Sequence, residues 1–280
     1  MDYANPDALV SPEWVIAHLG QPGVKILDAT HFIDKAANDA DADFREDHIP
    51  GAVRFDIDAI CDPATTLPHM LPTPEVFAAK VGALGIFNAD HVVVYDTAGM
   101  ATAACRAWWM FRVFGHDKVS VLNGSYPNYL RAKGPVESGE ATPSPARFTA
   151  TFRPELVRSA EQVAARTEQV IDARSSARFH GEAPEPRPSE RLGHIPGSIN
   201  LPFPDLLTRR EVTFKTASEL REEFAHAGVD LARPVTTTCG SGVTACVLTL
   251  GLYLLGIETS GVYDGSWAEW NRREEFPVEG

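Results

Sequence analysis

The sequence predicts an α/β protein made of two similar domains, each a parallel β-sheet with helices on both faces. Its length of 280 residues exceeds the commonest size of one domain and suits two. Several short segments recur in the same order in the two halves, and such an internal repeat determines the architecture. Within each half, apolar or β-branched runs alternate with helical patterns, which is typical of parallel sheets covered by helices.

The repeat consists of four pairs of matching segments. Residues 25–30 (KILDAT) match 169–174 (QVIDAR), and residues 47–53 (DHIPGAV) match 193–199 (GHIPGSI), at a spacing of 144 to 146 residues. Further along the chain, residues 73–85 match 217–228, and residues 121–125 (VLNGS) match 262–266 (VYDGS). Because the order is the same in both halves, we interpret them as two copies of one domain.

Composition between the copies predicts the domain boundaries. Residues 136–156 are rich in Pro and small polar residues, so we expect a linker there. This places an N-terminal domain at residues 1–135 and a C-terminal domain at residues 157–280.

Helix starts and strands can be placed in both copies. Ser11 precedes a proline, and Ser159 is followed three residues later by Gln162, so both serines fit helix N-caps, the second as a capping box. Short apolar or β-branched runs predict strands at residues 25–28, 91–95, 170–173 and 235–238.

Charge and composition exclude several classes of partner. The formal net charge is -13, and no dense Lys/Arg cluster offsets it, so nucleic acid and anionic membranes are poor partners. The sequence has no 18-residue apolar run, and its N-terminus does not resemble a signal peptide. We therefore expect a soluble, cytoplasmic protein.

The four cysteines predict neither a disulfide framework nor a zinc site. Cys61, Cys105, Cys239 and Cys246 are scattered and contain no C-x-x-C pair. A cysteine with a chemical role is the remaining interpretation, and Cys239 is the one with a distinctive surrounding sequence.

Cys239 begins a glycine-rich loop that favours an anion. It follows the predicted strand at 235–238, and ligands of open α/β sheets bind beyond the carboxyl ends of their strands. Gly240 and Gly242 allow successive N–H groups to point inward, and a helix expected from about Val243 adds the positive end of its dipole. We therefore expect a nucleophilic thiolate. The alternative is a small buried thiol in a strand-to-helix turn.

Two other kinds of site fit this loop less well. A tyrosine phosphatase loop carries an arginine six positions after its cysteine, and that position is Ala245 here. Apart from Cys246, which we expect in the helix core, no His or Cys lies near Cys239 in the sequence. We therefore predict neither phosphate binding nor a metal site.

The first copy provides an internal comparison. Aligning Gly99 with Gly242 places Asp96 at the position of Cys239, so the first domain has lost the nucleophile. We expect it to act by its shape or by lending residues across the domain interface.

Other residues recur in both copies and are expected to have structural roles. His48 and His194 open the two HIPG turns, and Asp28 and Asp172 lie at equivalent strand ends.

The sequence resembles the two-domain rhodanese-like sulfurtransferases over essentially the whole chain. The resemblance rests on tandem α/β domains with HIPG in each, a cysteine loop only in the second domain and Asp96 in the first. Within that family, loops of the type CGSGVTA mark the enzymes that use 3-mercaptopyruvate, whereas those that use thiosulfate usually carry basic residues in the loop. The uncharged Gly240 and Ser241 therefore resemble the mercaptopyruvate type.

The resemblance also implies substrate-binding residues. Arg178 and Arg187 match the family's substrate arginines, and forked donors suit a carboxylate beside a ketone. The alternative is that they are surface arginines paired with Glu182 or Glu185. Backbone N–H groups from Gly240 through Gly242 and Val243 to Thr244 would stabilise the negative outer sulfur of a persulfide.

A further group of residues is implied at the domain interface. The family places an Asp and a His, here Asp58 and His69, beside the loop serine, here Ser241, as a charge-relay-like trio. A carboxylate that orients an imidazole, which in turn contacts a hydroxyl, can transfer a proton. The alternative is that Asp58 and His69 only hold the interface together.

Together these features imply a sulfurtransferase that moves sulfur from 3-mercaptopyruvate through a Cys239 persulfide to an acceptor, with release of pyruvate. The expected acceptor is a thiol, such as reduced thioredoxin or a small thiol, or cyanide in an assay, and no metal or organic cofactor is required. The alternatives are a thiosulfate sulfurtransferase and a non-catalytic rhodanese-like binding module.

Overall fold

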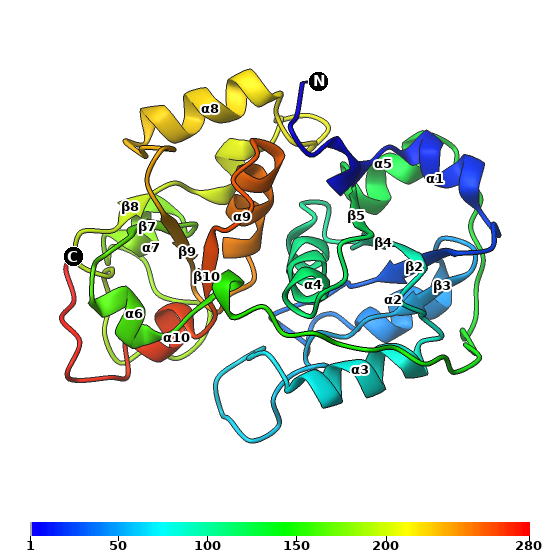
Figure 1. Ribbon diagram of the computed structural model, residues 1–280, viewed down its shortest axis with the longest axis horizontal. Coiled ribbons are helices and arrows are strands. Elements are labelled where there is room, and N and C mark those ends of the chain that lie inside the picture. The colour runs from blue at the N-terminus through cyan, green and yellow to red at the C-terminus, as the bar shows by residue number, and fades with distance from the viewer. Residues whose placement is uncertain (1) are drawn as a thin grey trace.

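Two parallel sheets form the framework of the protein, as the sequence predicts (Figure 1). The computed structural model describes residues 2–280. The first sheet has the order β1-β5-β4-β2-β3 and the second β6-β10-β9-β7-β8, so the two copies share one topology. All of these strand pairs are parallel.

The strands and helices of the first domain alternate along the chain. Its strands are β1 (Leu9–Val10), β2 (Val24–Asp28), β3 (Ala52–Arg54), β4 (His91–Tyr95) and β5 (Val119–Leu122). Its α-helices are α1 (Pro12–His18), α2 (Ala40–Glu46), α3 (Pro74–Ala83), α4 (Thr102–Val113) and α5 (Ser125–Arg131), and the short 3-10 helix η1 (Pro6–Ala8) precedes β1.

The second domain repeats this alternation. Its strands are β6 (Val157–Arg158), β7 (Gln169–Asp172), β8 (Ile199–Asn200), β9 (Val235–Thr238) and β10 (Gly261–Tyr263). Its α-helices are α6 (Ala160–Ala164), α7 (Ser176–Phe179), α8 (Ala217–His226), α9 (Ala245–Leu254) and α10 (Ser266–Trp270). The 3-10 helices η2 (Pro154–Leu156) and η3 (Phe203–Leu206) lie before β6 and after β8.

Strand alternation explains why helices cover both faces of the first sheet. In β4, Val92 and Val94 pack into one hydrophobic cluster with residues of α3 and α4, whereas Val93 and Tyr95 pack into another with residues of α1, α2 and α5. Both predicted N-caps are present: the Ser11 side chain accepts a hydrogen bond from the Trp14 N–H, and Ser159 forms a capping box with Gln162.

The two domains share a core along α4 and α9, which lie side by side between the sheets (Figure 1). Equivalent residues of the two copies also form equivalent contacts across the interface. Asn123 Oδ1 accepts the Phe214 N–H at 2.9 Å, and Asp264 Oδ2, at the equivalent position of the second copy, accepts the Leu71 N–H at 2.8 Å. Each copy therefore uses the residue after its last strand to hold the other domain.

The recurring histidines have structural contacts, as expected. His48 stacks on Phe44 and its Nδ1 lies 2.6 Å from the Phe44 carbonyl oxygen. His194 stacks on Phe179 in the same way and contacts the Phe179 carbonyl oxygen at 2.9 Å.

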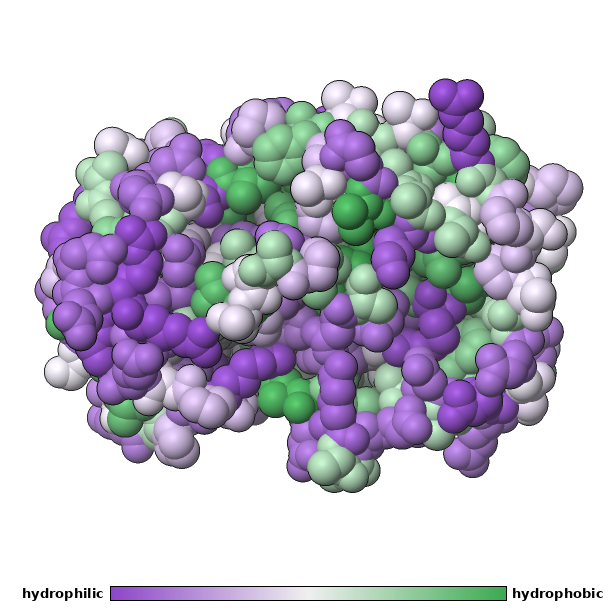
Figure 2. All heavy atoms as spheres, turned by 90° about the horizontal axis from the view of Figure 1, so that it is seen from below, coloured by the Kyte–Doolittle hydropathy of each residue, from purple (hydrophilic) through white to green (hydrophobic). Residues whose placement is uncertain are grey.

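The surface is largely polar. In the view from below, hydrophilic side chains gather over the second domain at the left, and hydrophobic residues form small separate groups nearer the middle (Figure 2). None of the helices among residues 2–280 is long and apolar enough to cross a membrane.

Candidate active site

Cys239 lies directly after β9, at the carboxyl end of the central strand of the second sheet. The residue is only 2% exposed but lines a cavity. Its backbone is held by the first turn of α10: the Cys239 N–H contacts Ser266 Oγ at 3.2 Å, and its carbonyl oxygen accepts the Trp267 N–H at 3.0 Å. The thiol is therefore fixed at the sheet edge where ligands of such folds bind.

The loop after Cys239 has unused hydrogen-bond donors. None of the backbone N–H groups from Gly240 to Thr244 donates to an acceptor within residues 2–280. Helix α9 begins at Ala245, two residues later than predicted, so these five groups remain in the loop that leads into the helix N-terminus. Clustered N–H groups without partners at a helix N-terminus form an anion site. The arrangement suits a thiolate or a persulfide anion on Cys239.

The two glycines of the loop lie in close contact with their surroundings. Gly242 has φ 74°, and a Cβ there would lie 2.7 Å from the Asp264 carbonyl oxygen. A Cβ on Gly240 would lie 2.7 Å from Arg178 Nη2. The loop therefore requires glycine at position 242 for its backbone conformation, and a side chain at position 240 would displace the guanidinium of Arg178.

The first domain fills the equivalent loop with its own carboxylate. Asp96 is fully buried, and its Oδ2 accepts the N–H groups of Ala103 and Ala104 at 3.1 and 3.2 Å. Its own N–H contacts Ser125 Oγ at 3.2 Å, as that of Cys239 contacts Ser266. Burial raises the pKa of Asp96 to about 6, although the hydrogen bonds that the carboxylate accepts act to lower the pKa. An internal acceptor thus occupies the anion position that the second domain leaves available.

Arg187 lies between two of the other predicted residues. Its Nη1 donates to Ser241 Oγ at 3.2 Å, and its Nη2 lies 2.9 Å from His69 Nε2. The sequence-based expectation was a direct contact between His69 and Ser241; instead, the guanidinium links them. Within residues 2–280, no carboxylate lies within ion-pair distance of Arg187, so its charge is available to a bound anion.

These contacts determine the tautomer of His69. A guanidinium can only donate hydrogen bonds, so Nε2 must accept and the ring proton must lie on Nδ1. Nδ1 is 2.6 Å from Asp58 Oδ1. Burial lowers the pKa of His69, and the positive charges of Arg187 and Arg106 lower it further. The hydrogen bond and charge of Asp58 raise the pKa but do not outweigh these effects. His69 is therefore a neutral imidazole whose unprotonated nitrogen points towards Arg187.

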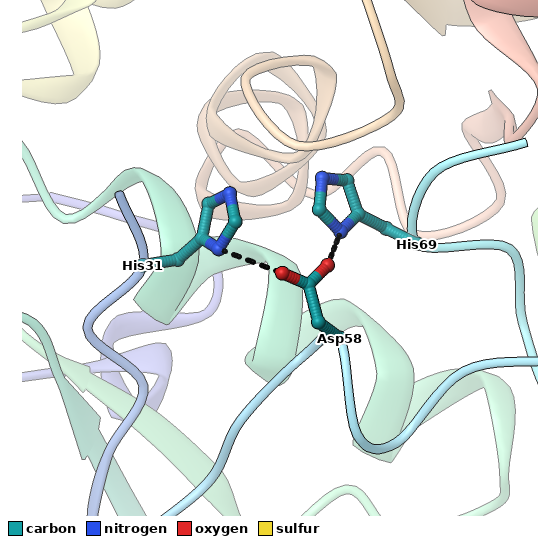
Figure 3. A group of neighbouring side chains, drawn as sticks. All are labelled: His31, Asp58 and His69. Carbon is teal, nitrogen blue, oxygen red and sulfur yellow. Dashed lines mark ion pairs between the residues drawn. The ribbon is translucent and has the colours of Figure 1, made fainter. Parts of the chain in front are cut away.

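Asp58 has three cationic or imidazole partners from the first domain, and two of them, His31 and His69, are drawn in Figure 3. Besides His69, its Oδ2 pairs with Lys35 and lies 3.5 Å from His31 Nδ1. Burial alone would raise the pKa of Asp58, but the hydrogen bonds from His69 and Lys35 outweigh it and lower the pKa. Asp58 is therefore a carboxylate that orients His69 and can stabilise its protonated form.

The donor atoms of His31, Asp58 and His69 all lie within 4.8 Å of one another, a spacing that could hold a metal ion (Figure 3). The hydrogen bonding argues for an ion-pair cluster instead. A metal on His69 Nδ1 would require a proton on Nε2, where the Arg187 donor lies. Asp58 is also already paired with Lys35.

Arg178 lines the cavity but has a carboxylate partner. Its Nε and Nη2 contact Glu185 Oε2, and Arg174 Nη1 contacts Glu185 Oε1 at 2.7 Å. This is the pairing with Glu185 that was the alternative for the sequence-predicted arginines. Arg178 is therefore held in place over Gly240, with its charge balanced by a carboxylate.

Arg106 was not predicted from the sequence, although it contacts three parts of the site. It is a completely buried residue of α4 in the first domain. Its Nη1 lies 2.6 Å from Asp264 Oδ1 and 3.2 Å from the Gly242 carbonyl oxygen, and its Nη2 donates to the His69 carbonyl oxygen. Because His69 has φ 60°, this bond helps to hold a backbone conformation that residues other than glycine rarely adopt.

These side chains surround one cavity of about 160 Å³ between the two domains. The first domain contributes His31, Ile33, Pro68, His69 and Thr102; the second contributes Arg178, Glu185, Arg187, Arg272 and the loop from Cys239 to Ser241 with Val243 and Thr244. Asp58 and Gly242 support the wall from behind. The structure thus brings every sequence-predicted site residue to this cavity or to its immediate support.

Comparisons with known proteins agree with this architecture. The family model described as a rhodanese-like domain matches residues 11–132 and 157–273. Human 3-mercaptopyruvate sulfurtransferase is 44% identical over 276 residues, which cover 95% of this chain and 92% of the human protein. Bovine thiosulfate sulfurtransferase is 42% identical over 276 residues, with the same two coverages.

A solved structure is also similar. SseA from Escherichia coli, described as having the rhodanese fold and as a 3-mercaptopyruvate sulfotransferase, superimposes with a TM-score of 0.85 at 39% identity. The match covers 93% of this chain and 98% of SseA. Because the human and bovine proteins use different donors at nearly equal identity, the donor has to be argued from the cavity.

Proposed function

The chain belongs to the rhodanese-like family, and from the geometry of its cavity we propose that it is a 3-mercaptopyruvate sulfurtransferase. The observation that carries the choice of donor is the charge of Arg187. Among the deep residues of the cavity, Arg187 is the arginine without a carboxylate partner, whereas Glu185 balances Arg178. One available cation in the deep part of the cavity suits the single carboxylate of 3-mercaptopyruvate better than dianionic thiosulfate.

Arg187 would bind the donor carboxylate and release His69 and Ser241. This exchange matters because the guanidinium now blocks His69 Nε2, the nitrogen that has to handle a proton. Arg178, held by Glu185 above Gly240, would donate to the carbonyl oxygen of the donor. The donor sulfur would then lie against Cys239.

The first half-reaction forms a persulfide. The Cys239 thiolate attacks the donor sulfur, the carbon–sulfur bond breaks, and the bonding electrons remain on carbon as the enolate of pyruvate. The proton of the donor thiol passes to His69 Nε2, with Ser241 alongside, and then to the enolate carbon. Asp58 stabilises the protonated imidazole during this transfer. The products are pyruvate and a Cys239 persulfide anion, with no net uptake of protons.

The loop stabilises the negative sulfur. The N–H groups from Gly240 to Thr244, which have no acceptor within residues 2–280, would donate to the anion that replaces the thiolate. In the second half-reaction an acceptor thiolate attacks the outer sulfur and releases the Cys239 thiolate. We propose a thiol acceptor, such as reduced thioredoxin or a small thiol.

The proposal is tested by comparing the two donors. Pyruvate release from 3-mercaptopyruvate and sulfite release from thiosulfate are measured with the same acceptor, for the wild type and for Cys239→Ser. We expect kcat/KM to be higher for 3-mercaptopyruvate, and no turnover by Cys239→Ser. Preference for thiosulfate would establish the alternative donor; no turnover of either donor by the wild type would favour a non-catalytic binding module.

A further inference from the structure

Arg272 is an exposed arginine that lines the Cys239 cavity, two residues after the end of α10. Its neighbour Arg273 contacts the nearby carboxylates Glu161, Glu269 and Glu275. Arg272 itself has no carboxylate within ion-pair distance in the described part of the chain, residues 2–280. It therefore presents an unbalanced positive charge at the solvent side of the cavity.

This charge stands out from the rest of the protein. The chain carries a formal net charge of -13, yet three arginines line the cavity and Glu185 is the acidic residue among its lining residues. Glu185 is already shared by Arg174 and Arg178. Charges of one sign around a cleft raise the local concentration of oppositely charged ligands. The cavity mouth is thus a positive region on an acidic protein.

Arg187 and Arg272 lie at different depths in the cavity, so each can bind a different ligand. Arg187 is in contact with Ser241 and His69, beside the reacting sulfur, where the donor carboxylate fits. Arg272 lines the same cavity but is exposed to solvent, so a second substrate that enters from solvent can reach it. A small donor bound at Arg187 leaves Arg272 available.

We propose that Arg272 forms an acceptor subsite that selects thiols carrying a carboxylate. The proposal rests on the sulfurtransferase function proposed above and names the class of its second substrate. The acceptor carboxylate pairs with Arg272 while its thiolate attacks the outer persulfide sulfur. The new sulfur–sulfur bond forms in the acceptor, the bond to Cys239 breaks, and the electron pair returns to the Cys239 thiolate.

The test uses three acceptors that share one skeleton and differ in charge: 3-mercaptopropionate, 2-mercaptoethanol and cysteamine. Arg272→Gln is compared with the wild type for each, with 3-mercaptopyruvate as donor. Because the two half-reactions are separate, kcat/KM for the acceptor reports the second step and kcat/KM for the donor the first. The ratio of variant to wild type cancels the intrinsic reactivity of each thiol. Arg209→Gln, at an exposed arginine outside the cavity lining, is the matched control.

For Arg272→Gln we expect kcat/KM to fall by about 2- to 5-fold with 3-mercaptopropionate, the range of an exposed ion pair. It should change by less than about 2-fold with 2-mercaptoethanol, rise with cysteamine and stay unchanged for the donor. With Arg272→Glu, the order of kcat/KM for the two charged acceptors, 3-mercaptopropionate and cysteamine, should be reversed. Added salt should reduce all of these differences in kcat/KM. Arg209→Gln should match the wild type.

Equal ratios for the three acceptors would overturn the proposal, as would a loss confined to the donor. A loss with reduced thioredoxin but not with 3-mercaptopropionate would assign Arg272 to a protein surface instead and also contradict it. Failure of the proposed function itself gives a different result, because the wild type would then release no pyruvate with any acceptor.

Discussion

Arg106 and Asp264 form a buried ion pair across the domain interface, with Nη1 and Oδ1 2.6 Å apart. Arg106 comes from α4 of the first domain, and Asp264 follows β10 of the second. The same guanidinium holds the carbonyl oxygens of Gly242 and His69. The domain without a nucleophile therefore supports both the cysteine loop and the histidine of the site.

Replacing Arg106 should cost stability and activity together. Arg106→Leu leaves the Asp264 carboxylate buried without its partner, which typically costs about 3–5 kcal/mol in the free energy of unfolding. Arg106→Lys keeps the charge but not the fork, so it should fold and still lose kcat, because one ammonium cannot reach all three acceptors. Urea unfolding and steady-state assays measure the two effects. A fully active Arg106→Lys enzyme would contradict this positioning role.

Arg187→Gln should impair the donor half-reaction. Losing a charged hydrogen-bonding partner of a carboxylate corresponds to about a 10- to 100-fold lower kcat/KM for 3-mercaptopyruvate. The control is alkylation of Cys239 by iodoacetamide, a neutral reagent, which should proceed at nearly the wild-type rate. An unchanged kcat/KM for the donor would show that Arg187 serves only to connect Ser241 and His69.

His31 should make the protein less stable in acid. Its side chain is 7% exposed, and burial lowers its pKa from 6.5 to about 4, with His69, Arg187 and Lys35 acting in the same direction and Asp58 against them. The unfolded chain therefore takes up a proton below pH 6.5 that the folded protein binds only near pH 4. The folded state loses about 2 kcal/mol from this group between pH 7.5 and pH 5.

The measurement is urea unfolding of the wild type and His31→Gln at these two pH values. Glutamine does not titrate, so the variant should lose about 2 kcal/mol less stability than the wild type on acidification. An equal loss in both proteins would mean that His31 is already protonated in the folded protein.

Asp96→Ala should lower the stability of the protein without lowering its activity, because Asp96 supports the loop of the first domain that has no nucleophile. The substitution leaves the N–H groups of Ala103 and Ala104 without their acceptor, at a cost of about 1–2 kcal/mol in the free energy of unfolding. Because Asp96 lies in the first domain and its side chain forms hydrogen bonds with Ala103, Ala104 and Ser125, none of which lines the cavity, kcat/KM for the donor should stay within about 2-fold of the wild type. A large loss of activity without a loss of stability would contradict this separation.

The repeat and the alternating patterns predicted much of what the structure contains. The sequence predicted the two parallel sheets, the two N-caps, the cysteine loop at a strand end and Asp96 at the equivalent position of the first domain. Each of these features depends on short stretches of sequence. Arg106 was not, since its partners Gly242 and Asp264 lie 136 and 158 residues away. The one signal was a charged residue inside the apolar run of α4.

The sequence named Glu185 as an alternative partner of the two arginines, and the structure pairs it with Arg178, seven residues away. The contacts of Arg187 with His69 and Ser241 were beyond the sequence, because they depend on how the two domains meet. Spacing along the chain carries no such information. The same is true of His31, which acquires its neighbours only when residues 31, 58 and 69 converge (Figure 3).

The most direct test of the central claim is the mass of the Cys239 peptide after mixing the enzyme with one equivalent of 3-mercaptopyruvate and no acceptor. We predict the addition of one sulfur atom to Cys239, accompanied by one equivalent of pyruvate, and loss of that sulfur when a thiol is added. Pyruvate release without added sulfur on Cys239, or sulfur found instead on Cys61, Cys105 or Cys246, would contradict the account.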